Sequence, residues 1–321
     1  MTDLDELLTV LRTAGESTRI RLLALCAQSE LAVTELTRIL GQSQPRVSRH
    51  LKLMVDAGLL ERFREGTWAF YRLAQRGPAR RVARQVMEMI PASDPAILRD
   101  RERLADVKAE RARLAADYFR KNAKRWDEIR RLHADDAEVE AALSDLLGDR
   151  PVDGFLDIGT GTGRMLELLG PRARRAVGID LSREMLNVAR ANLDRAGLTN
   201  CEVRLGDMYG LSADAERFDL VTVHQVLHYA DQPGLAIAEA ARVLAPGGRL
   251  VVVDFAHHDI EALRSEHAHR RLGFDDDEVA EWCRAAALDP RPPVSVPGDP
   301  LTVKIWMAAR NPAGASAVEE A

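Results

Sequence analysis

The second half of the chain alternates between short extended runs and helical patterns, and this alternation limits the fold more than any other feature. Apolar extended runs begin near residue 152, and helical patterns such as residues 183–197 and 234–248 separate most of them. Such alternation predicts an open, mainly parallel sheet with helices on both faces. The runs predicted as strands are GFLDIG, RAVGID, CEVRLG, FDLVTVH, RLVVVDF and LTVKIWMA.

A glycine-rich loop follows the first of these strands, in FLDIGTGTGR at residues 155–164. Gly159, Gly161 and Gly163 allow the backbone to approach a ligand closely. The spacing is GxGxG, whereas dinucleotide sites use GxGxxG. Asp157 stands just before the loop, where a carboxylate would repel a pyrophosphate but could hold an ammonium group. The loop therefore indicates a nucleotide-like cofactor other than NAD.

Carboxylates end the next two strands. Asp180 follows Gly163 by 17 residues and can accept hydrogen bonds from both hydroxyls of a ribose. Asp207 ends the third strand, near the expected adenine amino group, and Leu181 and Met185 can flank the adenine. Partners for an ammonium, a ribose and an adenine describe S-adenosyl-L-methionine. The alternative is that these aspartates only cap helices.

The segments LDIGTGTGR, GIDLSREML, GDMYGLSADAERFDLVTVHQVLHYADQP and LAPGGRLVVVDF resemble the class I methyltransferases, especially those that methylate small molecules. The resemblance covers residues 115–310, because YFRKNAKRWDEIR is similar to the helix that covers the cofactor. It implies a Rossmann-like domain with a seven-stranded, mainly parallel sheet, a small-molecule methyl acceptor, and S-adenosyl-L-homocysteine as the product. The residues assigned to the cofactor are Asp157, Gly159, Thr160, Gly161, Gly163, Asp180, Leu181, Met185, Asp207, Met208 and His224.

Six of the eight histidines lie within residues 224–269, after the fourth and fifth predicted strands. Ligands bind at these strand ends in open α/β sheets, and an imidazole there could take a proton from the acceptor. The candidate catalytic residues are His224, His228, His258 and His267. The histidines could instead bind a metal with Asp254, Asp259 or Glu266, or lie on a surface helix; no metal site is predicted.

The first 75 residues predict short helices followed by a hairpin that turns at Glu65–Gly66, which is a winged helix-turn-helix. In QPRVSRHLKLMVDAG, Val47, Leu51 and Met54 share one side and should pack inward, and Ser43 can cap the helix. The opposite side is basic, and Arg62, Arg64 and Arg72 on the wing should lie near phosphates. The residues predicted to contact DNA are Gln44, Arg46, Ser48, Arg49, His50, Lys52, Arg62 and Arg64.

This region resembles the ArsR/SmtB repressors over residues 5–75, most specifically in SQPRVSRHLK. The resemblance implies a homodimer that binds a two-fold, double-stranded DNA operator. In that family, two thiols in an ELCVCDL-like segment sense soft metals. Here Ala32 and Thr34 stand at the thiol positions. The domain therefore resembles a metal sensor without its metal site, and any signal must arrive elsewhere.

The charge distribution separates the two halves. Residues 76–131 carry 16 Lys and Arg against 9 Asp and Glu, whereas residues 132–321 carry 19 against 32. A polyanion should therefore meet only the front of the chain. The predicted organisation is a winged-helix domain at 1–90, a helical linker with lid helices at 91–148, the methyltransferase domain at 149–311 and a disordered tail at 312–321. Residues 96–132 should form mostly one long helix.

Three isolated cysteines indicate reduced thiols in a cytoplasm, and no apolar run is long enough to predict a membrane span. The sequence as a whole predicts a two-domain α/β chain: a transcriptional regulator with a fused methyltransferase that acts on a small molecule. The alternative is a repressor that senses S-adenosyl-L-methionine or its demethylated product without catalysis.

Overall fold

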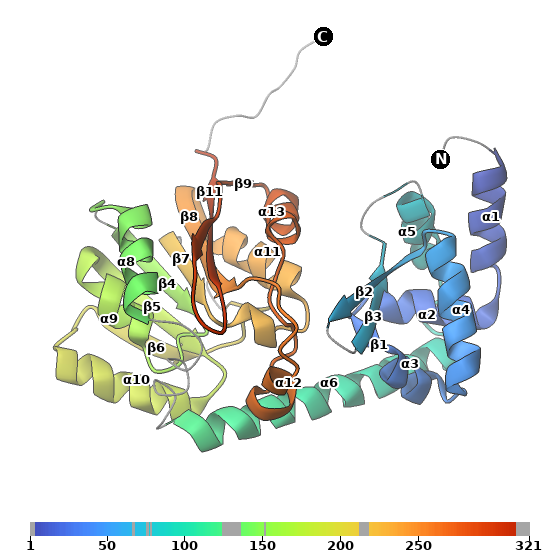
Figure 1. The fold of residues 1–321 in the computed structure, drawn as a ribbon, viewed down its shortest axis with the longest axis horizontal. Coiled ribbons are helices and arrows are strands. Elements are labelled where there is room, and N and C mark those ends of the chain that lie inside the picture. The colour runs from blue at the N-terminus through green and yellow to red at the C-terminus, as the bar shows by residue number, and fades with distance from the viewer. Residues whose placement is uncertain are drawn as a thin grey trace, which may run out of the picture. The chain divides into compact units, whose positions relative to one another are not determined.

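A computed structural model describes residues 4–65, 68–74, 77, 79–123, 136–150, 152–211 and 218–312. The chain forms two compact units, unit 1 at Met1–Arg113 and unit 2 at Leu114–Ala321 (Figure 1). Three expectations fall outside the described residues: the turn at Gly66, the part of the long helix after residue 123, and the tail from residue 313.

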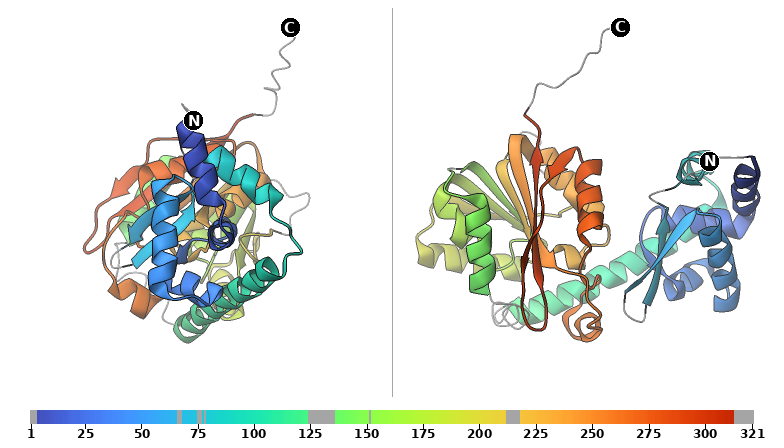
Figure 2. Two further views of the ribbon diagram at one scale, coloured as in Figure 1. Left: turned by 90° about the vertical axis from the view of Figure 1, so that its right-hand side faces the viewer. Right: turned by 45° about the horizontal axis from the view of Figure 1, so that its top comes forward.

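Unit 1 contains a helix-turn-helix followed by a two-stranded wing (Figure 2). Gly41, with φ of 65°, ends the first helix of the pair in the left-handed conformation that favours glycine. Strand order is β1-β3-β2, and all pairs are antiparallel. The elements of unit 1 are α1 Leu4–Ala14, α2 Ser17–Cys26, β1 Leu31–Ala32, α3 Val33–Leu40, α4 Gln44–Asp56, β2 Leu60–Glu65, β3 Trp68–Leu73, α5 Ala79–Met89 and the start of α6 Pro95–Asn122.

The predicted inward face of the recognition helix α4 is confirmed. Val47, Leu51 and Met54 are completely buried, and they belong to the same core as Leu36 and Ile39 of α3. Ser43 occupies the N-cap position of α4, but its hydroxyl makes no capping hydrogen bond. The helix pair is therefore held by apolar packing, which leaves the polar side of α4 exposed.

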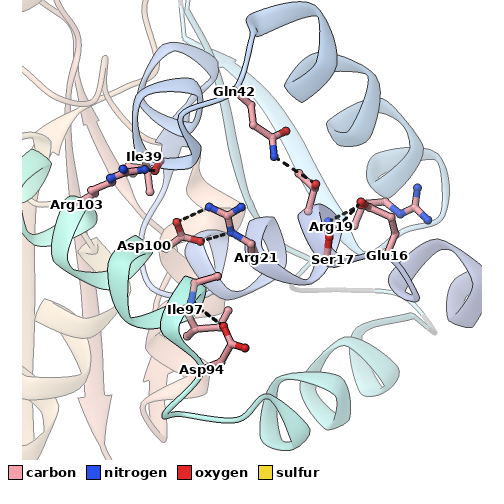
Figure 3. A network of polar contacts seen from close by, with 12 residues as sticks. Glu16, Ser17, Arg19, Arg21, Ile39, Gln42, Asp94, Ile97, Asp100 and Arg103 are labelled. Atoms are coloured by element: carbon pink, nitrogen blue, oxygen red, sulfur yellow. Dashed lines mark hydrogen bonds and ion pairs between the residues drawn. The ribbon is translucent and has the colours of Figure 1, made fainter.

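The first half of α6 belongs to unit 1, whereas the sequence assigned residues 91–148 to a separate linker. The Arg21 guanidinium donates two hydrogen bonds, of 2.6 and 2.7 Å, to the buried carboxylate of Asp100 (Figure 3). Arg103 also donates to the carbonyl of Ile39, at 2.8 Å (Figure 3). Leu104 and Val107 of α6 complete the core. The structured part of unit 1 thus extends beyond the predicted boundary at residue 90.

Replacing Arg21 by alanine should strongly destabilise unit 1, because the Asp100 carboxylate would stay buried without its cation. Removing one partner of a buried pair costs about 3 kcal/mol or more. Urea denaturation followed by circular dichroism measures the free energy of unfolding. Arg38→Ala is the control, because its pair with Glu110 is exposed and should contribute little. Equal stabilities of the two variants would contradict the prediction.

Unit 2 is built on one sheet with the strand path β10-β11-β8-β7-β4-β5-β6. This path has seven strands, the number that the resemblance implies, and six of them correspond to the predicted runs; β10 was not predicted. A further strand, β9, pairs with β11. From β6 to β8 all neighbours are parallel, and β11 is antiparallel to β8. The strands are β4 Val152–Ile158, β5 Ala173–Asp180, β6 Cys201–Leu205, β7 Phe218–His224, β8 Leu244–Phe255, β9 Leu288–Pro290, β10 Val294–Val296 and β11 Val303–Arg310.

Helices cover both faces of this sheet (Figures 1 and 2). On one face lie α8 Asp136–Leu147, α9 Arg164–Leu169 and α10 Arg183–Ala196. On the other lie α11 Pro233–Val243 and α13 Asp276–Ala285, whose core includes Trp282. Strand order reverses between β4 and β7, where ligands bind at the carboxyl ends of strands in such sheets. Within the described ranges, no helix is both long and apolar enough to cross a membrane.

Candidate cofactor, acceptor and DNA-binding sites

The glycine loop after β4 has the backbone conformation that its sequence predicts. Gly159, Gly161 and Gly163 have φ angles of 71°, 52° and 86°. A Cβ atom on Gly159 would collide with the side chain of Val226. The backbone N–H of Thr160 donates to the carbonyl of Ile179 at 2.8 Å and so ties the loop to β5. Val226 therefore packs directly against Gly159, and the positive φ angles of the three glycines give the loop a course that other residues rarely adopt.

Asp180 connects the end of β5 to this loop. Its carboxylate accepts hydrogen bonds from the backbone N–H groups of Gly161, at 2.9 Å, and Ser182, at 2.8 Å. Burial raises the pKa of the Asp180 carboxyl, although these two hydrogen bonds oppose the shift. The carboxylate is thus fixed beside the loop, where it suits a hydroxyl donor such as a ribose. No described residue group of three or more His, Cys, Asp or Glu could hold a metal ion.

The remaining predicted cofactor residues differ in exposure. Asp157 is buried and accepts a hydrogen bond from the hydroxyl of Thr222 at 2.6 Å, so one of its oxygens is already engaged. Leu181 is 65% exposed, whereas Met185 is 1% exposed. Met185 therefore packs inside the domain, and the two residues do not flank a common exposed surface. Of the other residues assigned to the cofactor, Thr160 is buried, Met208 and His224 are half-buried, and Asp207 is exposed. Their roles in cofactor binding stay predictions.

Replacing Asp180 by alanine should weaken the binding of S-adenosyl-L-methionine at least about tenfold. The loss of a hydrogen bond to a charged group costs about 1.5–3 kcal/mol. Isothermal titration calorimetry measures the affinity. Asp153→Ala is the matched control, because Asp153 is an exposed carboxylate near the opposite end of β4 that pairs with Arg174. An unchanged affinity in a folded Asp180 variant would remove this residue from the site.

His228 lies in a short 3-10 turn, Leu227–Tyr229, after β7. Its Nδ1 atom is 2.8 Å from the carboxylate of Asp254, and its backbone N–H donates to the same carboxylate at 3.2 Å. Because a carboxylate accepts, Nδ1 carries a proton, which leaves a lone pair on Nε2 in the neutral ring. Nε2 is buried and has no hydrogen-bond partner among the described residues. His228 is therefore oriented as a proton acceptor.

His258 has the opposite arrangement. Its Nδ1 accepts a hydrogen bond from the backbone N–H of Ile260 at 3.2 Å, so the proton of the neutral ring is on Nε2. Burial, helped by the nearby His228, lowers the pKa of His258 to about 4. Within the part of the chain that the structure describes, Nε2 of His258 also lacks a partner. At neutral pH His258 is a hydrogen-bond donor and a weak base.

Two further side chains, Tyr118 and His269, lie in this cluster of histidines. Neither is among the residues predicted to be catalytic. The Tyr118 hydroxyl is 2.8 Å from Nδ1 of His267, and burial raises the pKa of Tyr118 to about 12. His269 stacks on His228, with ring centroids 4.1 Å apart. The sequence placed Tyr118 only in the helix that covers the cofactor, and His269 was one of the two histidines in SEHAHRR at residues 265–271. Of the four candidates, the structure gathers His228, His258 and His267 near these rings, and His224 ends β7.

The residues predicted to contact DNA differ in whether their side chains are exposed or contact another residue of unit 1. Gln44, Arg46, Arg49, Lys52 and Arg62 are exposed, and Ser48 is partly exposed. Nδ1 of His50 lies 3.6 Å from the carboxylate of Glu16, so its ring is turned toward the start of α2. The side chain of Arg64 lies outside the described residues.

The expectation that Arg72 lies near phosphates does not fit its contacts. Its guanidinium donates to Glu61 at 3.0 Å and to Glu30 at 3.3 Å, and it lies over the ring of Phe63. Residues 61 and 72 face each other in the β2–β3 register, which places the opposite charges together. Arg72 therefore joins the two strands of the wing and links them to Glu30, just before β1.

Replacing Arg49 by alanine should weaken binding to a specific operator by about 1–3 kcal/mol, because an exposed arginine on a recognition helix can bond a guanine edge bidentately. Fluorescence anisotropy with labelled operator DNA measures the affinity. Arg190→Ala removes an exposed arginine from unit 2 and serves as the charge-matched control. Loss of cofactor affinity together with DNA affinity would indicate misfolding instead.

Two family models match the chain. Residues 16–62 match "Bacterial regulatory protein, arsR family", and residues 156–252 match "Methyltransferase domain". These matches confirm the resemblance of residues 5–75 to the ArsR/SmtB repressors and of the second half of the chain to the methyltransferases. They also lie on the helix-turn-helix of unit 1 and on the strands β4 to β8 that carry the glycine loop and Asp180.

Similar proteins match parts of the chain. An uncharacterized 37.1 kDa protein in transposon TN4556 of Streptomyces fradiae is 38% identical over 116 residues, which are 35% of this chain and only 33% of that protein. The ubiquinone biosynthesis O-methyltransferase of Leptothrix cholodnii is 26% identical over 174 residues, covering 49% of this chain and 74% of that enzyme. The methyltransferase solved in complex with the Haloferax volcanii Trm112 methyltransferase activator is 21% identical, with a TM-score of 0.51, over 60% of this chain and 97% of that chain, which shows a shared fold.

Proposed function

We propose that this chain, which joins an arsR-family DNA-binding segment to an S-adenosyl-L-methionine-dependent methyltransferase domain, regulates transcription and methylates a hydroxyl group of a small molecule. The observation that carries the catalytic part is the pairing of His228 with Asp254. In this pair Nε2 of His228 is buried and has no hydrogen-bond partner among the residues that the structure describes, and it follows β7 at the edge of the sheet where ligands bind in such folds. A sensor that only binds the cofactor has no need of a base.

The bound cofactor would supply an electrophilic methyl group. Nε2 of His228 would accept the proton of the attacking hydroxyl, which makes the oxygen a better nucleophile. The Asp254 carboxylate would hold the ring in the required tautomer and stabilise the imidazolium that forms. Asp254 also accepts from the backbone N–H of Phe255 at 2.8 Å, so its position is fixed before the reaction. Removal of a positioned base typically costs about 10²–10⁴ in rate.

A hydroxyl acceptor agrees with the O-methyltransferase among the similar proteins. The rings near His228 favour a flat acceptor: Tyr229, Phe255 and His269 lie with centroids 4.1–5.2 Å from it. Aromatic ligands pack well against such edges and faces.

The regulatory part rests on unit 1. The exposed side of α4 would enter the major groove, and a homodimer would place two such helices on a two-fold operator.

The three free cysteines, of which Cys26 and Cys283 are buried, suit a reducing cytoplasm.

A second candidate is a repressor that senses S-adenosyl-L-methionine or S-adenosyl-L-homocysteine without catalysis. The residues at positions 32 and 34 favour it, because alanine and threonine cannot supply the thiols of a metal sensor. Unit 1 would then need another signal, and the cofactor is available on the same chain. The two candidates differ in whether a methyl group leaves the bound donor.

Methyl transfer is tested with methyl-labelled S-adenosyl-L-methionine and a panel of phenols, catechols and aliphatic alcohols. We expect transfer to at least one class, and His228→Asn should lower kcat by about 10²–10⁴ without changing cofactor affinity. His257→Asn replaces an exposed histidine of the same segment and is the control. Tight cofactor binding with no labelled product from any class would favour the sensor.

A further inference from the structure

The helix α6 belongs to both compact units. It runs from Pro95 to Asn122, whereas unit 1 ends at Arg113 and unit 2 begins at Leu114. Residues 96–122 contain neither glycine nor proline, the two residues that weaken or break a helix. The boundary between the units therefore falls inside a continuous helix and not in a loop. Secondary-structure elements of this kind can carry energetic coupling between two sites.

Within unit 1, α6 holds α3, the first helix of the helix-turn-helix, near both of its ends. Near the start of α3, Arg111 forms an ion pair with Glu35, which also accepts from the backbone N–H of Ala32 at 2.9 Å. Near its end, Arg103 donates to the carbonyl of Ile39. The buried side of α3 shares one core with the recognition helix α4 and with α6. A shift of α6 would therefore act on the helix pair that is predicted to bind DNA.

Within unit 2, the last turns of α6 contact the cluster of histidines. The Tyr118 hydroxyl lies 2.8 Å from Nδ1 of His267. The ring of Phe119 meets the ring of Tyr229 edge to face, with centroids 4.8 Å apart, and Tyr229 directly follows His228. Only about two helical turns separate Tyr118 from the last contact with α3. One helix therefore carries contacts to the DNA-binding core and to the candidate catalytic residues.

The contact between Phe119 and Tyr229 leads on to the glycine loop. The backbone N–H of Tyr229 donates to the carbonyl of Val226 at 3.0 Å. Val226 packs so closely against Gly159 that a Cβ atom on the glycine would lie 2.4 Å from its side chain. A ligand that moves or orders the glycine loop would therefore act on Val226, then on the turn of Tyr229, and then on α6. Coupling between distant sites travels through contiguous packing and hydrogen bonds of this kind.

We propose that α6 couples the occupancy of the cofactor site in unit 2 to the affinity of unit 1 for DNA. A cofactor at the glycine loop would change the contact of Tyr229 with Phe119, and α6 would then change how it holds α3. This inference rests on the proposed binding of cofactor and DNA and adds the regulation that joins them. Because coupling between two binding sites is reciprocal, DNA would change the affinity for the cofactor by the same factor.

The experiment measures DNA affinity of the full chain by fluorescence anisotropy, with a labelled duplex that the chain selects from a random-sequence library. Affinities are compared without ligand and with saturating S-adenosyl-L-homocysteine, which has no methyl group to transfer. A typical coupling would appear as a change of about 5- to 150-fold. Isothermal titration calorimetry of S-adenosyl-L-homocysteine, with and without the duplex, should give the same factor.

Two double variants separate the helix from its side chains. Arg113 and Leu114 are exposed and lie where the two units meet in sequence. Arg113→Gly with Leu114→Gly weakens the helix between its two sets of contacts, whereas Arg113→Ala with Leu114→Ala removes the same side chains and preserves the helix. The alanine variant should keep the change in DNA affinity, and the glycine variant should lose most of it. Phe119→Leu, which removes the ring contact with Tyr229, should also reduce the change.

Binding of the duplex alone and of S-adenosyl-L-homocysteine alone shows that both units of each variant are folded. Equal DNA affinities with and without S-adenosyl-L-homocysteine, in a chain that binds it, would overturn the inference and leave the proposed methyltransferase standing. An undiminished change in the glycine variant or in Phe119→Leu would overturn the route through α6. A change in DNA affinity without methyl transfer to any acceptor would support the inference together with the sensor. Absence of S-adenosyl-L-homocysteine binding would overturn the cofactor site itself, and the inference with it.

Discussion

The reversal of strand order between β4 and β7 is the constraint on which the arrangement of unit 2 depends. The chain places β5 and β6 on one side of β4 and β7 and β8 on the other. Because these five strands are parallel, their carboxyl ends share one edge of the sheet. The glycine loop and the turn that contains His228 follow such ends, and Asp180 is the last residue of β5. Groups suited to a cofactor and groups suited to an acceptor therefore meet through topology, although long stretches of sequence separate them.

Features governed by local periodicity could be predicted from the sequence. The spacing of Val47, Leu51 and Met54 predicted the buried side of α4. The position of Asp180 at a strand end predicted a ribose partner, but not its hydrogen bond with the Gly161 N–H group of the glycine loop. Helical periodicity also places Met185 with Leu186, Ala189 and Leu193 on the buried side of α10, which begins at Arg183. The role of Met185 beside the adenine stays a prediction.

Features that depend on contacts between distant segments could not be predicted. The pairing of Arg72 with Glu61 requires the register of the wing, which the composition of the hairpin does not reveal. The contact of Tyr118 with His267 joins residues 149 positions apart. The opposite tautomers of His228 and His258 depend on which backbone or carboxylate group meets each Nδ1 atom. The six histidines within residues 224–269 indicated a catalytic or binding role at the carboxyl ends of the strands. Only the contacts of each Nδ1 atom show that His228 can accept a proton and that His258 donates a hydrogen bond.

The ion pair of Arg21 with Asp100 also defines how the DNA-binding part can be isolated. A fragment cut at residue 90, where the sequence suggests a domain end, would contain the arginine and lack the carboxylate, Leu104 and Val107. Apolar side chains of α2 and α3 would then be exposed to solvent, and an exposed apolar surface promotes aggregation. A fragment for crystallisation or DNA screening should therefore run to Arg113, where the compact unit ends. In this chain the smallest fragment of unit 1 with a closed core includes the part of α6 up to Arg113.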